Sequence, residues 1–253
     1  MVIFHTFGDS HSTAEQSVWT FPVDEPHAVQ THYLGPVLMH SFGRDGGLTP
    51  SSLLEYGVTV GDWVCFCFGE IDCRCHVNKH VSSSQTFEQV IDKLVSSYMA
   101  AIAKTSTAAP GVNVAVFMVV PPSRRHVAFN PEFPYVGTDE QRCAYTLYMN
   151  IALKRACTRF SYTFIDAYDA YVDSEGFLDA SKSDGKNHAR FNVPIQIIVS
   201  NLLGKNGVGR GDEERRKSAH AYIFWIVLAI ILFVVCLGML FFTWHRQRAK
   251  TVK

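Results

Sequence analysis

Short apolar runs bounded by turn residues recur along the first two thirds of the chain. Runs of this kind are typical of strands that are buried on both faces of a parallel sheet. The sequence predicts five such strands, at Val2–Phe7, Val37–Phe42, Asp62–Phe68, Val112–Val120 and Tyr162–Asp166.

Longer segments with helical spacing separate the later strands. Apolar residues recur every three or four positions from Phe87 to Ile102, and Thr86 with Gln89 forms a capping-box pattern at the start. A second capping-box pattern precedes a predicted helix at 139–157.

A third helix is expected from Pro194, a residue favoured in the first turn, to Gly204. The early connections at His11–Gly35 and Arg44–Gly61 lack long helical patterns. We interpret them as loops with short helices such as Ser51–Tyr56.

Strands that alternate with helices predict a three-layer α/β/α domain with a parallel sheet. Right-handed crossovers place the carboxyl end of every strand at one edge of such a sheet. Polar residues that follow the strands are therefore expected to gather at that edge.

A second apolar pattern differs in length from the strands. The 24 residues from Ala221 to Trp244 contain no charged side chain. A helix of this length exceeds the roughly 30 Å hydrocarbon core of a bilayer. The sequence thus predicts a transmembrane helix, with Trp225 and Trp244 near its two ends in the manner of an aromatic belt.

The predicted organisation is an α/β domain at 1–204, a charged, glycine-containing linker at 205–220, the membrane helix at 221–244 and a short basic tail at 245–253. The chain starts directly with an apolar run and shows no signal-peptide pattern. We therefore expect a single-pass C-terminal anchor, with the large domain facing the cytosol.

The net charge and the cysteine spacing argue against nucleic-acid binding and zinc binding. The formal net charge is zero, so no basic field favours a nucleic-acid partner. Four cysteines at 65, 67, 73 and 75 invite a zinc interpretation, but their paired Cys-x-Cys spacing is not the common one for zinc. We expect no metal, no other cofactor and reduced thiols.

Candidate catalytic residues lie in three segments, two at the ends of predicted strands and one late in the chain. Gly8-Asp9-Ser10 ends the first strand, Gly69 to His76 follows the third, and Asp184 and His188 stand close together late in the chain. A serine needs a base to act as a nucleophile, and the base needs a partner that holds its tautomer. Ser10, His188 and Asp184 can form such a set, whereas the alternative is a capped turn with Ser10 as the N-cap.

This combination resembles the SGNH/GDSL hydrolase family over the whole predicted α/β domain, and the resemblance implies a flavodoxin-like parallel sheet. The resemblance implies Ser10 as the nucleophile, His188 as the base and Asp184 as its orienting partner. It also implies that the backbone N–H groups of Ser10 and Gly43 bind the oxyanion.

Two features depart from the family pattern. Ile71 stands where the family carries an asparagine that donates to the oxyanion, and Arg74 is the nearby donor that could substitute. The late Asp184–His188 spacing is one residue longer than usual. A divergent branch that carries Gly-Glu-Ile-Asp-Cys-Arg resembles this chain at both points.

The predicted substrate cleft contains Asp9, Glu70, Asp72 and Arg74. The resemblance implies a serine esterase that acts through an acyl-enzyme on an O-acylated sugar or lipid. An acyltransferase remains an alternative, as does a non-catalytic, membrane-tethered binding module, which the loss of the asparagine at Ile71 favours.

Overall fold

The computed structural model describes residues 2–13, 19, 29–125 and 131–203. All of them belong to a compact unit, Met1–Leu203, and the predicted membrane segment lies outside them. The elements in chain order are β1 (Phe4–Gly8), η1 (Ser10–Ser12), β2 (Val29–Tyr33), α1 (Met39–Asp45), α2 (Pro50–Glu55), β3 (Trp63–Cys67), η2 (Asp72–His76), α3 (Val77–His80), α4 (Phe87–Thr107), β4 (Asn113–Phe117), α5 (Asp139–Phe160), β5 (Thr163–Ile165), η3 (Tyr168–Ala170) and η4 (Ala180–Lys182). A further helix occupies residues 193–203.

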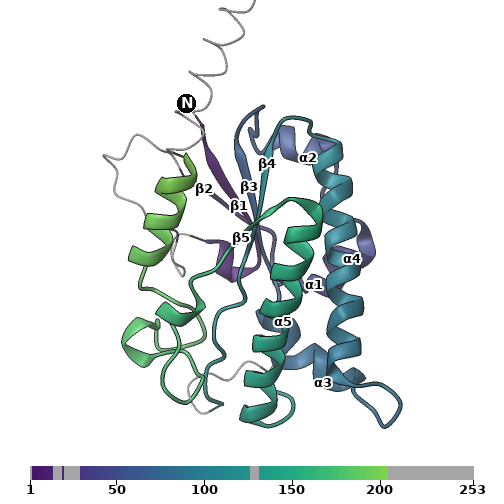
Figure 1. Ribbon diagram of the computed structural model, residues 1–253, viewed down its shortest axis with the longest axis vertical. Coiled ribbons are helices and arrows are strands. Elements are labelled where there is room, and N and C mark those ends of the chain that lie inside the picture. The colour runs from purple at the N-terminus through teal and green to yellow at the C-terminus, as the bar shows by residue number, and fades with distance from the viewer. Residues whose placement is uncertain (1, 14–18, 20–28, 126–130, 204–253) are drawn as a thin grey trace, which may run out of the picture. The chain divides into compact units, whose positions relative to one another are not determined.

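The five strands form one parallel sheet in the order β2-β1-β3-β4-β5 (Figure 1). This is a flavodoxin-like order, as the family resemblance implied. Strand β1 pairs with β2 on one side and β3 on the other, so the residues that follow β1 emerge at the middle of the sheet's carboxyl edge.

Helices cover both faces of the sheet and complete three layers. On one face Phe66 and Val116 pack with Ile91 of α4 and Met149 of α5. On the other face Cys65 and its neighbours pack with apolar side chains of the 193–203 helix. This confirms the three-layer architecture, and both capping boxes form as predicted, at Thr86 and Thr138.

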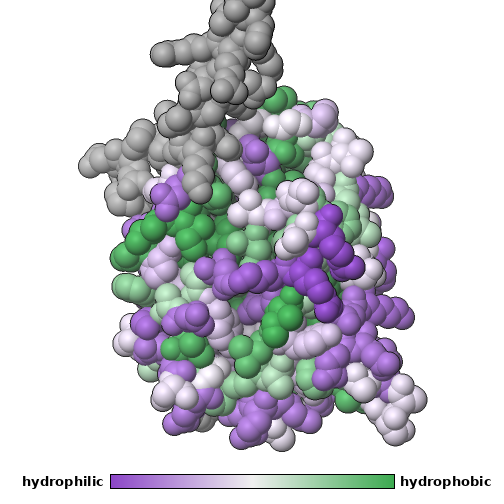
Figure 2. Space-filling model, viewed as in Figure 1, coloured by the Kyte–Doolittle hydropathy of each residue, from purple (hydrophilic) through white to green (hydrophobic). Residues whose placement is uncertain are grey.

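The outer surface of the 193–203 helix remains partly apolar. Val193 and Ile197 are exposed on it, and Phe191 is exposed just before it. Figure 2 shows hydrophobic surface in this part of the molecule, among mainly polar side chains.

The predicted second strand is wrong. Met39 to Asp45 form helix α1, and the strand that pairs with β1 is Val29–Tyr33, inside the predicted loop. Strand β2 lies at the edge of the sheet, and none of its residues is fully buried. Its sequence, Val-Gln-Thr-His-Tyr, has three polar residues in a row and therefore shows no continuous apolar run. In α1 the buried residues are Met39 and Phe42, which are spaced for one face of a helix.

Candidate active site

Ser10 lies at the turn that ends β1, where the chain passes very close to β3. A Cβ on Gly8 would stand 2.0 Å from the Cys67 carbonyl oxygen, so only glycine fits at this point. Asp9 is the N-cap of the following turn η1, and its side chain accepts the His11 N–H. The alternative interpretation of Ser10 as the N-cap is therefore wrong, and the Ser10 hydroxyl is free for another partner.

That partner is His188. Its Nε2 lies 2.8 Å from Ser10 Oγ, and its Nδ1 lies 2.8 Å from Asp184 Oδ2. A carboxylate accepts only, so Nδ1 carries a proton and donates it to Asp184, which leaves Nε2 to accept the Ser10 hydroxyl proton. The structure joins the three predicted residues in one hydrogen-bonded series, in the order that a nucleophile, a base and an orienting acid require.

The local loop explains the unusual spacing between the acid and the base. Asp184 Oδ1 accepts the Lys186 N–H at 2.8 Å and the His188 N–H at 3.2 Å, and Gly185 adopts a positive φ of 79°. A short bridge between Ser183 and Ala189 closes the loop. The carboxylate thus organises the turn that returns His188 to it, although one more residue intervenes than in the family pattern.

The electrostatics of the pair suit a neutral base beside a charged acid. Burial raises the pKa of Asp184, but the hydrogen bonds from His188 and the Lys186 N–H outweigh it, and the pKa falls below its ordinary value. Burial lowers the pKa of His188, and nearby His11 lowers it further. At neutral pH, therefore, His188 is uncharged and Asp184 is ionised.

His11, the residue directly after Ser10, also belongs to the site. It is buried, and its ring centroid lies 5.1 Å from that of His188. The signal available in the sequence was its position directly after Ser10. Asp9, which was predicted to line the cleft, is instead fully buried and pairs with His11 at 2.9 Å, so that assignment is corrected.

The predicted role of Gly43 at the oxyanion is also wrong. Gly43 lies within α1, which packs against α4. A Cβ at this position would stand 3.0 Å from the Ser97 carbonyl carbon and from the Tyr98 nitrogen. The glycine therefore permits close helix packing, and the prediction failed because the strand before it was placed wrongly.

The loop that follows β2 offers a different backbone donor at this edge. Leu34 donates its N–H to the Gly8 carbonyl at 2.8 Å, which places Gly35 beside the end of β1. Within the described ranges, no acceptor is found for the Gly35 N–H or the Ser10 N–H. The Ser10 N–H and the Gly35 N–H are thus candidate oxyanion donors at this edge of the sheet.

Three residues of the predicted cleft are parts of the framework. Asp72 is fully buried, and its carboxylate accepts the Met39 N–H at 2.6 Å and the His40 N–H at 3.1 Å, which caps the start of α1. Glu70 and Arg74 are buried and form a two-pronged pair at 2.8 and 3.0 Å. Their assignment to an open cleft is therefore corrected.

Arg74 is further committed by its remaining contacts. Its Nη1 donates to the Phe133 carbonyl, and its guanidinium stacks over the Tyr135 ring at 5.7 Å. The guanidinium therefore holds the segment around Phe133, and this engagement argues against the predicted oxyanion role.

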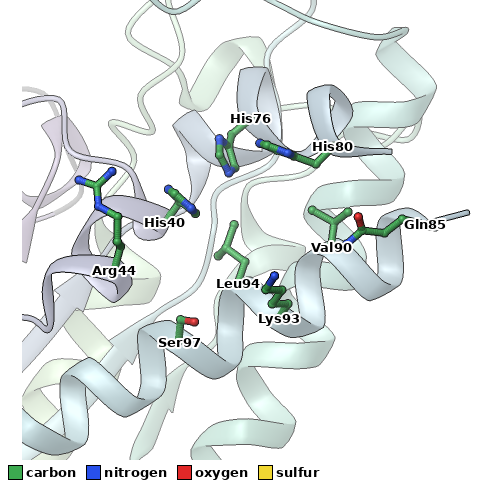
Figure 3. Close-up of a pocket in the computed structure, with 9 residues that line it drawn as sticks. All are labelled: His40, Arg44, His76, His80, Gln85, Val90, Lys93, Leu94 and Ser97. Atoms are coloured by element: carbon green, nitrogen blue, oxygen red, sulfur yellow. The ribbon is translucent and has the colours of Figure 1, made fainter. Parts of the chain in front are cut away.

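A separate hollow of about 340 Å³ lies between α1, α3 and α4 (Figure 3). Three histidines with Arg44 and Lys93 supply much of its wall, and the triad residues do not line it. Its lining residues are His40, Arg44, His76, His80, Gln85, Val90, Lys93, Leu94 and Ser97. The serine, histidine and aspartate thus lie outside this basic hollow.

Across residues 2–13, 19, 29–125 and 131–203, no group of histidine, cysteine or carboxylate side chains is arranged to hold a metal ion. Within the same ranges, no helix is both long and apolar enough for a membrane span.

Comparisons with known proteins identify the fold. No protein-family model and no curated protein sequence matches the chain. A GDSL-like lipase from Bacteroides thetaiotaomicron superposes with a TM-score of 0.52 at 10% identity, over 80% of this chain and 88% of that one. A candidate acylhydrolase from Bacteroides fragilis superposes with a TM-score of 0.52 at 12% identity, over 80% and 86%. The chain shares the fold of these proteins.

Proposed function

We propose that this domain is a serine hydrolase of the SGNH type that cleaves acyl esters through an acyl-enzyme. The observation that carries the proposal is the hydrogen-bonded series Ser10–His188–Asp184, with 2.8 Å at each link. An activated serine needs this combination of a base within reach and a carboxylate that fixes the base's tautomer. The likeness to a GDSL-like lipase supports the same chemistry.

The reaction follows from the positions of these atoms. Ser10 Oγ attacks the acyl carbonyl carbon while His188 Nε2 takes the hydroxyl proton, and the carbonyl oxygen becomes the oxyanion. The backbone N–H groups of Ser10 and Gly35 stabilise that charge. When the intermediate collapses, His188 returns the proton to the departing alcohol oxygen, and Ser10 is left acylated.

Water completes the cycle by the same route. His188 Nε2 takes a proton from a water molecule, whose oxygen attacks the acyl carbon. The second intermediate releases the carboxylic acid and regenerates the Ser10 hydroxyl. Asp184 accepts the hydrogen bond from the Nδ1–H of His188 throughout and stabilises the imidazolium that forms in each half.

Labelling with a fluorophosphonate probe tests the proposal without a known substrate. The wild-type chain is expected to react, whereas Ser10→Ala and His188→Ala are expected to lose labelling while they keep the native circular dichroism spectrum. Ser96→Ala and His80→Ala change exposed residues outside the triad and serve as matched controls. A folded wild type that labels no better than Ser10→Ala would refute the hydrolase and favour the non-catalytic binding module.

We further propose an O-acylated sugar or lipid as the substrate class, and the 221–244 segment as a membrane anchor for a domain in the cytosol. Rates on p-nitrophenyl acetate and p-nitrophenyl octanoate compare short with long acyl groups. For the anchor, a chain that lacks residues 219–253 is expected in the soluble fraction of a cell lysate. Recovery of this shortened chain with the membranes would contradict the anchor.

A further inference from the structure

His11 joins the nucleophile turn to the loop that carries the base. Its Nδ1 lies 2.9 Å from Asp9 Oδ1, and its Nε2 lies 3.1 Å from the Asn187 carbonyl oxygen. Asn187 is the residue before His188, so this contact anchors the base's loop 176 residues away in sequence. The Trp19 indole donates to the His11 carbonyl at 2.8 Å and holds the turn from the other side.

The partners of His11 determine its charge. A carboxylate oxygen and a carbonyl oxygen can only accept hydrogen bonds, whereas a neutral imidazole carries one N–H. Both contacts are therefore satisfied together only when both ring nitrogens donate, which requires the imidazolium. Asp9 Oδ1 also accepts the His11 backbone N–H at 2.9 Å, as expected of an ionised carboxylate.

The surrounding charges support the same state. Burial lowers the pKa of His11, but the charge and hydrogen bond of Asp9, together with Glu70 and the Asn187 carbonyl, raise it to about 9. The charged and titratable groups that act on His188 are His11, Asp184 and Glu70. Among these three, His11 is the one that favours the neutral form of His188, and its ring centroid lies 5.1 Å from that of His188.

We propose that His11 is a charged positioning residue, whose hydrogen bond to the Asn187 carbonyl fixes the base's loop and whose positive charge keeps His188 neutral and ready to accept the Ser10 proton. The inference rests on the proposed hydrolase. His11 then helps to set the acid limit of the reaction, which is the lowest pH at which His188 is still neutral.

The test uses the full-length protein and follows the histidine side chains by NMR during a pH titration. His188 is assigned by comparison with His188→Gln, and His11 by comparison with His11→Gln. In the wild type, His11 is expected to stay protonated up to about pH 9. In His11→Gln, loss of the neighbouring positive charge is expected to raise the titration midpoint of His188 by about one pH unit.

Labelling supplies the second measurement. The acid limit of the fluorophosphonate reaction is expected to move to higher pH in His11→Gln by the same amount, and to stay in place in the matched control His80→Gln. A role that is only structural would lower the labelling rate at all pH values without moving the limit.

The outcomes separate the two proposals. A His188 midpoint that does not move, or a wild-type His11 that titrates near its ordinary pH, overturns the role of His11 even if the wild type labels normally. A wild type that does not label while the His188 midpoint moves overturns the hydrolase and leaves the charge of His11 established. If His11→Gln does not fold, His11→Asn supplies the assignment of His11, and the wild-type titration then decides the charge.

Discussion

Asp72 carries the sharpest quantitative prediction, because a fully buried carboxylate caps a helix beside the candidate site. Burial raises its pKa to about 7 from 3.8, although the N–H groups of His40 and Met39 oppose the shift, and the negative charge of Asp9 adds to it. Across this interval the native state keeps a proton that the unfolded chain has already lost.

The sign of the linkage follows from that difference. Because the native state binds more protons than the unfolded state, the free energy of unfolding falls as pH rises from the unfolded pKa to the folded one. The full displacement corresponds to roughly 4 kcal/mol at about 1.4 kcal/mol per pH unit. Of this, about 2 to 3 kcal/mol is lost between about pH 5 and about pH 8.

The perturbation is Asp72→Asn, which has no titrating proton and keeps a carbonyl that accepts one of the two N–H groups. Urea denaturation at the two pH values gives the free energies of unfolding. Relative to the wild type, the variant is expected to gain about 2 to 3 kcal/mol on going from about pH 5 to about pH 8.

Asp62 offers a matched control, since it is also a buried carboxylate that accepts two backbone N–H groups. Burial raises its pKa, but the bonds from Ile3 and Thr59 outweigh it, and the pKa lies below its ordinary value. The contribution of Asp62 itself is lost only as pH falls through the acid range. Because Asp62 Oδ2 lies 3.7 Å from His5 Nε2 and opposes the lowering of that histidine's pKa by burial, the control compares His5→Gln/Asp62→Asn with His5→Gln, and these two are expected to run parallel between pH 5 and 8. Parallel behaviour of Asp72→Asn would refute the reasoning, because Asp72 would then be ionised in the native state at both pH values.

Other variants test the framework around the site. Gly43→Ala is expected to lose about 1 to 3 kcal/mol of stability from overpacking against α4. Its labelling rate per folded molecule is expected to stay unchanged, and a large fall in that rate would show that Gly43 does bind the oxyanion. Arg74→Met leaves Glu70 charged and unpaired in the interior and is expected to cost about 3 to 5 kcal/mol in thermal or urea unfolding, and the double variant with Glu70→Gln is expected to recover part of it. Thr86→Ala removes the capping side chain of α4 and is expected to cost about 1 kcal/mol; a melting temperature equal to that of the wild type would contradict this.

Four of the five strands were predicted: the three interior strands β1, β3 and β4, and the edge strand β5. Both faces of β3 are covered, so every residue is apolar and the run is visible in the sequence. The edge strand β2 has no such run. Helix α1 was missed for a related reason, because its cap comes from Asp72, which lies 33 residues beyond Met39 in the chain. A local sequence pattern does not reveal a helix N-terminus whose capping side chain comes from so far away in the chain.

The same distinction applies to the site. Ser10, Asp184 and His188 were found because the order of short motifs is local information that a known family pattern makes recognisable. Whether a polar residue lines a cleft or supports the interior depends on three-dimensional packing, and Asp9 and Asp72 were misplaced for that reason. The pairing of His11 with the Asn187 carbonyl is likewise a product of folding that no spacing in the sequence predicts.

The hydrogen bond from Ser10 to His188 spans 178 positions of the chain. During synthesis the serine therefore emerges long before its base, and it gains no proton acceptor until nearly the entire domain has been made and folded. Closing so long a loop contributes to folding only when the intervening sheet is already assembled. Reactivity at Ser10 would thus report on completed folding, and an incomplete chain would carry the serine in an unreactive form.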